Sequence, residues 1–142
     1  MSCVLSIIGE NFDVDAFVNE SKIRGFNVGY KGDPINKVNK RTRTFSLASI
    51  TTSNADFDNI KDQIEETIEF LVKYKSSLIH IANTPGIECA TIDFGVESII
   101  DKNHLTQSFN FPIELIKVCA DLGIEIELSI YKPDMQTILE KG

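Results

Sequence analysis

The feature that most constrains the fold is a helix, a stop and a strand that follow one another over residues 111–131. Pro112 is a typical first residue of a helix, and Gly123 is a typical residue just beyond a helix end. From Ile124 to Tyr131 apolar and polar residues alternate, which predicts a strand with one buried and one solvated face. A helix that leads directly into such a strand predicts an α+β fold.

Other elements follow from the same kinds of pattern. Residues 4–8 are almost continuously apolar, which predicts a central strand covered on both faces. Asp13 is placed to cap a short helix at its N-terminus. Further strands are predicted over residues 26–30, 41–50, 89–96 and 108–111, with a loop at 51–54.

The longest predicted helix follows from apolar residues spaced three and four apart over residues 57–72. Asn54 or Asp56 is placed to cap it. Its apolar stripe consists of Phe57, Ile60, Ile64, Thr67, Ile68, Leu71 and Val72. An amphipathic helix of this kind must bury its stripe against another layer, and the predicted strands supply one.

The order of these elements predicts an α+β fold with a mixed, largely antiparallel sheet of about five or six strands and helices packed on one side. The 142 residues are expected to form a single domain, with a core over residues 3–132 and a short C-terminal tail at 133–142. A chain of this length buries roughly 68–70% of its unfolded surface and needs neither disulfides nor a metal to fold.

The cysteines and the apolar runs indicate a compartment. Cys3, Cys89 and Cys119 are an odd number at wide spacings in apolar surroundings, which is typical of buried thiols in a reducing environment. No apolar stretch approaches the roughly 20 residues of a membrane span, and no basic leader precedes the first strand. We expect a cytoplasmic protein that does not associate with membranes.

Charge is distributed unevenly along the chain. Residues 22–43 contain seven basic residues and one acidic residue, a net of +6, while the remainder contains seven basic and twenty acidic residues, a net of −13. The overall charge of −7 disfavours non-specific binding of nucleic acid. The distribution permits a basic protein partner on the acidic body or an anionic ligand on the basic segment.

No catalytic, metal-binding or cofactor-binding motif is evident, so no catalytic residue, metal ligand or cofactor is predicted. The nucleophile elbow, the P-loop, the dinucleotide-binding glycine pattern and paired cysteines are all missing from the sequence. His80 and His104 are far apart and lack the spacing of a zinc helix. Cys119 falls on the apolar stripe of its helix, where a structural thiol is the simpler interpretation. Asp13 and Asp15 suit the first turn of a helix better than a cation site.

Two groups of residues remain as candidates for binding. Lys31, Arg41 and Arg43 belong to the basic segment 31–43, and the last two share a strand face that an anionic ligand could contact. No aromatic residue is interleaved with them, so the pattern lacks a platform for stacking bases.

The second group lies on the last strand. Glu125 and Glu127 alternate with apolar residues and share a face with Tyr131. If helices covered this face, buried carboxylates would indicate a pocket. If the face is solvated, an acidic surface around a tyrosine suits a basic protein partner.

Short motifs in a fixed order give the chain a family resemblance. They are Gly9, Asp13-Val14-Asp15, Lys31-Gly32-Asp33, Thr44-Phe45-Ser46-Leu47, Pro112-Ile113-Glu114-Leu115, Leu122-Gly123 and the strand that ends at Tyr131. In this order they resemble the bacterial domain-of-unknown-function family 4279 over about residues 3–132. The resemblance implies a fold and assigns no activity or site.

Three functional hypotheses follow. The first is a non-catalytic protein-binding module of the bacterial cytoplasm, similar in size and charge to immunity proteins, which neutralise toxins by binding them. The second is a small domain that binds an anionic ligand through residues 31–43. The third is an unrecognised enzyme, which would require a deep pocket that joins His80 or His104 to two carboxylates. Homodimerisation through an edge strand is compatible with each of them.

Overall fold

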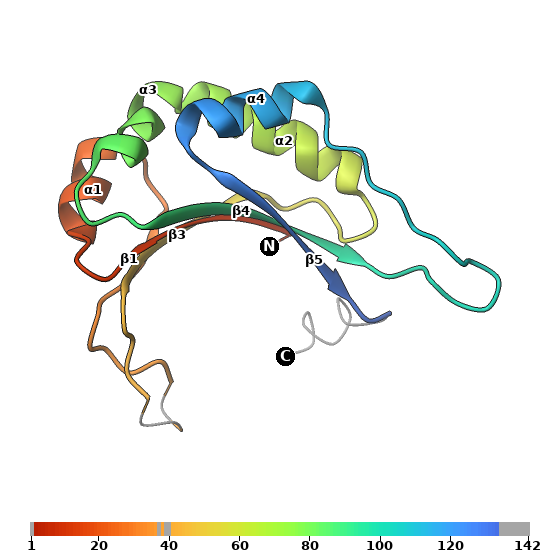
Figure 1. Cartoon of the computed structure of the whole chain (residues 1–142), viewed down its shortest axis with the longest axis horizontal. Coiled ribbons are helices and arrows are strands. Elements are labelled where there is room, and N and C mark those ends of the chain that lie inside the picture. Colours follow the sequence, from red (N-terminus) through yellow and green to blue (C-terminus); the bar gives the residue numbers. More distant parts are fainter. Residues whose placement is uncertain (1, 37, 39–40, 134–142) are drawn as a thin grey trace.

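The computed structural model describes residues 2–36, 38 and 41–133, so the predicted tail from residue 134 onward lies outside the described residues. Within this part of the chain, five strands form one mixed sheet with helices on one face, which confirms the predicted α+β fold (Figure 1). The strands lie in the order β2-β3-β1-β4-β5. Their bounds are β1 Cys3–Gly9, β2 Asn27–Gly29, β3 Ser46–Ser53, β4 Cys89–Glu97 and β5 Glu125–Tyr131.

The helices lie on the convex side of the curved sheet, where α2 and α4 run side by side (Figure 1). Their bounds are α1 Val14–Ser21, α2 Ile60–Lys73, α3 Lys75–Leu78, the 3-10 helix η1 Ile79–Asn83, and α4 Ile113–Leu122. None of the described helices combines the length and apolar character that crossing a bilayer would require.

Strand directions follow from the connections. β1 pairs antiparallel with β3 and with β4, whereas β5 runs parallel to β4 because the chain returns between them through α4. The register places Leu5 of β1 between Ile50 of β3 and Ile92 of β4. These three side chains are buried under the helices and form the centre of the core.

The central strand β1 is covered on one face only. Leu5 and Ile7 are fully buried, whereas Val4, Ser6 and Ile8 are half-buried. The prediction that residues 4–8 are covered on both faces is therefore wrong. An apolar run indicates a buried strand, but none of the described helices covers the second face of this one.

The strand β3 continues through residues predicted to form a loop. Residues 51–53 belong to the strand and pair with β1, and the hydroxyl groups of Thr52 and Ser53 are bonded to side chains of α2. Thr52 Oγ1 lies 2.8 Å from Thr67 Oγ1 of α2, and Ser53 Oγ donates to the Glu66 carboxylate. The prediction of a loop at these residues is therefore wrong, because their polar side chains bind α2 rather than water.

The ends of the helices differ in detail from the prediction. α2 is capped by Asn59, whose side chain accepts a hydrogen bond from the Asp62 N–H, rather than by Asn54 or Asp56. Val72 is 59% exposed and does not belong to the buried stripe.

The remaining boundaries are mostly as predicted. Asp13 caps α1 through the Ala16 N–H, and Gly123 ends α4 with a φ of 72°. The strand predicted over residues 108–111 is wrong, because these residues belong to the connection between β4 and α4 and form no strand. Pro112 lies at the N-cap of α4, one residue before the first helical position predicted for it, and makes no side-chain capping hydrogen bond.

Two glycines allow the turn after β1 to pack against the turn before β4. A Cβ at Gly9 would overlap the Gly86 carbonyl oxygen, and a Cβ at Gly86 would overlap the Asn11 carbonyl oxygen. Gly86 also has a φ of +89°, which L residues with side chains rarely adopt. The contact therefore requires glycine for both its space and its backbone conformation.

We expect Gly86→Ala to destabilise the protein more than Gly32→Ala. Gly32 has a similar φ of +93° but nothing within 4 Å of its would-be Cβ, so it isolates the conformational cost of about 1–2 kcal/mol. Overlap with Asn11 adds at least about 1 kcal/mol at residue 86. Urea unfolding of the two variants measures the difference, and equal losses would contradict the close contact.

Two of the three thiols are buried in the core. Burial raises the pKa of Cys3 to about 11 and the pKa of Cys119 to about 11. Cys89 is only partly buried, on the face of the sheet that the helices leave open. Because the thiolate is the reactive species, Cys3 and Cys119 are protected in two ways: reagents cannot reach them, and their thiols stay protonated.

We expect iodoacetamide at pH 8 to alkylate Cys89 in the folded protein and to spare Cys3 and Cys119. All three should react in denaturant. Mass spectrometry of tryptic peptides identifies the modified residue, and rapid labelling of Cys3 under native conditions would contradict its burial.

Candidate functional site

The face of the sheet without helices, which we call the open face, carries the predicted acidic residues. The register pairs Ile126 and Leu128 of β5 with the core residues Ile92 and Phe94 of β4. Because successive side chains of a strand point to opposite faces, Glu125 and Glu127 lie on the open face. Both side chains are exposed.

A third carboxylate joins them from β4. The register places Thr51, Val4, Asp93 and Glu127 in one row across β3, β1, β4 and β5. Asp93 and Glu127 are therefore direct neighbours, and the charge of the row is confined to its β4–β5 end. We call Asp93, Glu125 and Glu127 the acidic patch.

The contacts of the acidic patch leave its negative charge unneutralised. Ser129 Oγ lies 2.7 and 2.9 Å from the two Asp93 carboxylate oxygens and donates to them. Cys89 Sγ lies 3.7 Å from Glu125 Oε2. Within residues 2–36, 38 and 41–133, no lysine, arginine or histidine forms an ion pair with these carboxylates. In this part of the chain the patch therefore contacts only neutral groups.

Tyr131, the third predicted residue of this strand, is engaged within the chain. Its ring stacks on Phe57, with centroids 5.1 Å apart and planes at 9°. Its carbonyl oxygen accepts a hydrogen bond from the Ser98 N–H. Gly95 leaves room for both rings, since a Cβ there would lie 3.3 Å from an atom of each. Tyr131 therefore anchors the end of β5 beside the acidic patch.

The predicted basic residues lie on an arm that projects from β2 and β3 away from the helices (Figure 1). Lys31 Nζ lies 3.2 Å from Glu10 Oε1, so its charge is partly offset. The half-buried Arg43 packs its guanidinium on Gly29, where a Cβ would lie 2.9 Å from Cζ. Arg41 is exposed. The three side chains have different surroundings, and Lys37 and Lys40 lie outside the described residues.

A hydrogen bond ties the base of this arm to α1. The Tyr30 hydroxyl donates to Asp15 Oδ1 over 2.7 Å. This bond favours the neutral phenol and raises the pKa of Tyr30 above its ordinary value. With the Lys31–Glu10 pair, it fixes the arm at its root.

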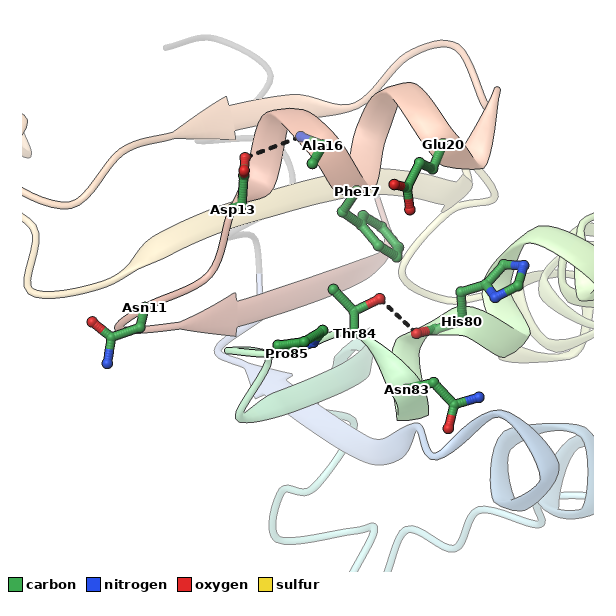
Figure 2. Close-up of a pocket in the computed structure, with 9 residues that line it drawn as sticks. All are labelled: Asn11, Asp13, Ala16, Phe17, Glu20, His80, Asn83, Thr84 and Pro85. Carbon is green, nitrogen blue, oxygen red and sulfur yellow. Dashed lines mark hydrogen bonds between the residues drawn. The ribbon is translucent and has the colours of Figure 1, made fainter.

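A cleft between α1 and η1 gathers His80, Asp13 and Glu20 around a volume of about 410 Å³ (Figure 2). Asp13 accepts from the Ala16 N–H as the helix cap, and the His80 carbonyl accepts from Thr84 Oγ1. In Figure 2, Asp13 and His80 lie at opposite ends of the cleft. General acid–base catalysis requires groups within hydrogen-bond reach of one reacting atom. The residue types of the enzyme hypothesis are present, but among the described residues no hydrogen bond or ion pair joins the side chains of His80, Asp13 and Glu20.

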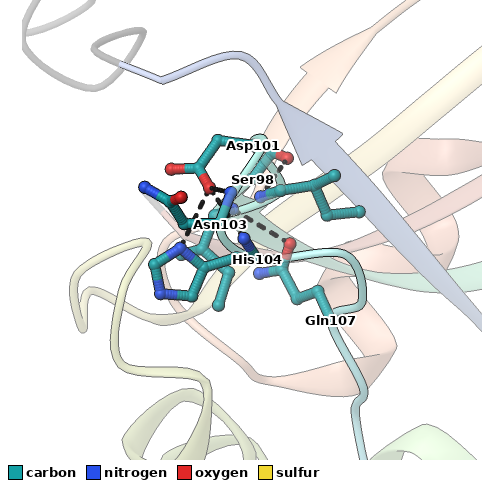
Figure 3. Close-up of polar contacts among 7 residues, drawn as sticks. Ser98, Asp101, Asn103, His104 and Gln107 are labelled. Carbon is teal, nitrogen blue, oxygen red and sulfur yellow. Dashed lines mark hydrogen bonds and ion pairs between the residues drawn. The ribbon is translucent and has the colours of Figure 1, made fainter.

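The second histidine lies in the loop between β4 and α4 (Figure 3). Asp101 Oδ1 accepts from the N–H groups of Asn103 and His104, at 2.7 and 2.8 Å, and lies 3.1 Å from His104 Nδ1. These bonds, led by that from Asn103, lower the pKa of Asp101. The contacts are those of a self-contained turn. Across the described residues, no three His, Cys, Asp or Glu side chains are grouped to hold a metal ion.

Comparison with known proteins identifies the family. A family model described as "Domain of unknown function (DUF4279)" matches residues 1–133. The chain belongs to the DUF4279 family. The sequence resemblance is thereby confirmed, and DUF4279 membership assigns no activity. No curated protein and no solved structure matches the chain.

We expect Asp15→Asn to lower the pKa of Tyr30 towards that of an ordinary phenol. The substitution removes the negative charge that favours the protonated hydroxyl. NMR titration of the tyrosine rings resolves Tyr30 from Tyr74 and Tyr131, which serve as internal controls. An unchanged Tyr30 titration would show that the arm is not tied to α1 in solution.

Proposed function

We propose that the chain is a non-catalytic protein-binding module that presents the open face of its sheet to a basic partner protein in the bacterial cytoplasm. An immunity protein that neutralises a toxin by binding it would have this form. The observation that carries the proposal is the acidic patch, in which three neighbouring carboxylates lack a basic partner among the described residues.

Physical arguments favour a protein over a small molecule at this surface. The open face is a sheet surface of half-buried polar and apolar side chains, such as Ser6, Thr91 and Val4, next to the charged patch. A broad surface of this kind suits a macromolecular contact, whereas small ligands prefer concave pockets. Unneutralised carboxylates raise the association rate of a basic partner and select against acidic ones.

The alternative of an anionic ligand on the basic arm has less support. Lys31 is already paired with Glu10, and Arg43 packs on the backbone at Gly29. An anion site needs several donors directed at one point. Arg41 alone is exposed without a described side-chain partner, and one exposed arginine does not form such a site.

We expect Glu125→Lys/Glu127→Lys to weaken partner binding by on the order of tenfold or more, because it replaces attraction with repulsion. The partner is first isolated by affinity pull-down from an extract of the source organism, with the wild-type protein as bait. Calorimetry with the purified partner then compares the dissociation constants at low and high salt.

The matched control is Glu65→Lys/Glu69→Lys, which makes the same charge change at exposed positions of α2, on the other side of the sheet. This variant should bind nearly as the wild type does. Equal losses in both double variants would reduce the effect to net charge, and an unaffected Glu125→Lys/Glu127→Lys would remove the open face from the proposal.

A further inference from the structure

Among the described residues, no strand lies beside the outer edge of β5. β5 is the last strand in the sheet, pairs with β4 along all seven of its residues, and has no other strand neighbour in the described part of the chain (Figure 1). The Tyr131 carbonyl accepts from Ser98 on the β4 side. Because N–H and C=O directions alternate along a strand, those of Ile126, Leu128 and Ile130 point outward.

The two edges of the sheet are not equivalent. At the opposite edge, β2 has only three residues and continues into the projecting arm. β5 has seven residues, and the side chain of Ile130 near its end is 57% exposed. A long edge strand with free backbone groups is a template for an added strand unless something on it opposes pairing.

The side chains of β5 define what the template would accept. An added strand would place alternate side chains beside Glu125 and Glu127 on the open face, with Cβ atoms about 4.5–5.5 Å apart. Lysine or arginine at those positions would meet two carboxylates backed by Asp93 of β4. Acidic residues there would meet like charges.

The other face of an added strand would be apolar. Its remaining side chains would lie beside Ile126, Leu128 and Ile130 on the helix side of the sheet. On α4, Asp121 is paired with Lys75 and therefore marks the flank of the helix that faces α3. Ile116 lies about 140° around the helix from Asp121, on the opposite flank. Ile116 is 49% exposed, so this flank of α4 carries an accessible apolar side chain.

We propose that the partner binds as an extended segment of alternating basic and apolar residues that adds to β5 as a further strand. This inference rests on the proposed function and specifies the form of the partner. Main-chain hydrogen bonds to Ile126, Leu128 and Ile130 supply affinity, and the acidic patch selects for basic side chains. A second copy of this chain is a poorer occupant, since it would add its own Glu125 and Glu127 to the same acidic face.

A capped eight-residue peptide of alternating lysine and valine is the probe, and the same peptide with glutamate in place of lysine is its control. We expect the lysine peptide to slow amide hydrogen exchange at Ile126, Leu128 and Ile130 by at least tenfold, as followed by NMR. The amides of Glu127 and Ser129, which already face β4, should change little. The glutamate peptide should leave all five unchanged.

Two substitutions at one exposed position separate the backbone from the side chain. Ile130→Pro removes an outward N–H while leaving the pairing with β4 intact, as proline at a sheet edge can. Ile130→Thr alters the side chain and keeps the N–H. We expect the proline variant to weaken peptide binding at least tenfold and the threonine variant less than threefold.

The outcomes distinguish this inference from the proposed function. Binding that requires Glu125 and Glu127 but leaves the outward amides unprotected and tolerates Ile130→Pro would overturn strand addition and leave the open face as the docking surface. If the lysine and glutamate peptides bind equally well, or if neither peptide binds, the inference is overturned. If the outward amides are already protected without peptide, and the protein has the mass of a dimer, a second copy of the chain occupies the edge. That result would also overturn the inference.

Discussion

One-sided burial of the sheet is the constraint on which the rest of the structure depends. Leu5, Ile50 and Ile92 form a continuous apolar layer under the helices, and burial of such a layer is the main favourable term in folding. Because the helices of the described chain all cover that layer, the opposite face is left to side chains that tolerate water. The acidic patch is a consequence of this division, since its carboxylates occupy positions that the core does not use.

The connection through α4 decides where the charge gathers. It brings β5 into the sheet parallel to β4 and in a register that sets Glu127 beside Asp93. An antiparallel hairpin in the same place would have given other neighbours. Packing of Tyr131 on Phe57 holds the far end of the strand, and Gly123 directs the chain into its near end. The position of the carboxylates is thus set by apolar and backbone contacts rather than by charge.

Local patterns predicted most of the fold, because they report on single elements. Alternation predicted β5 and the shared face of Glu125 and Glu127, and proline and glycine predicted the bounds of α4. Properties that depend on partners distant in sequence were not predictable from one chain. Asp93 was not predicted as part of a site, because the β4–β5 register depends on how the long connection through α4 packs. The Lys31–Glu10 pair and the half-buried second face of β1 are likewise set by tertiary packing.

The central position of β1 has a consequence for synthesis of the chain. This strand is made first, yet its two neighbours end at Ser53 and Glu97. Until β4 has left the ribosome, Leu5 and Ile7 lack half of their sheet partners, and the nascent chain exposes a strand of high apolar content. Pairings so distant in sequence form slowly, and unpaired strands of this kind are prone to aggregate. The sheet can therefore be completed only after β4 and β5 have been synthesised and the helix α4 between them has packed.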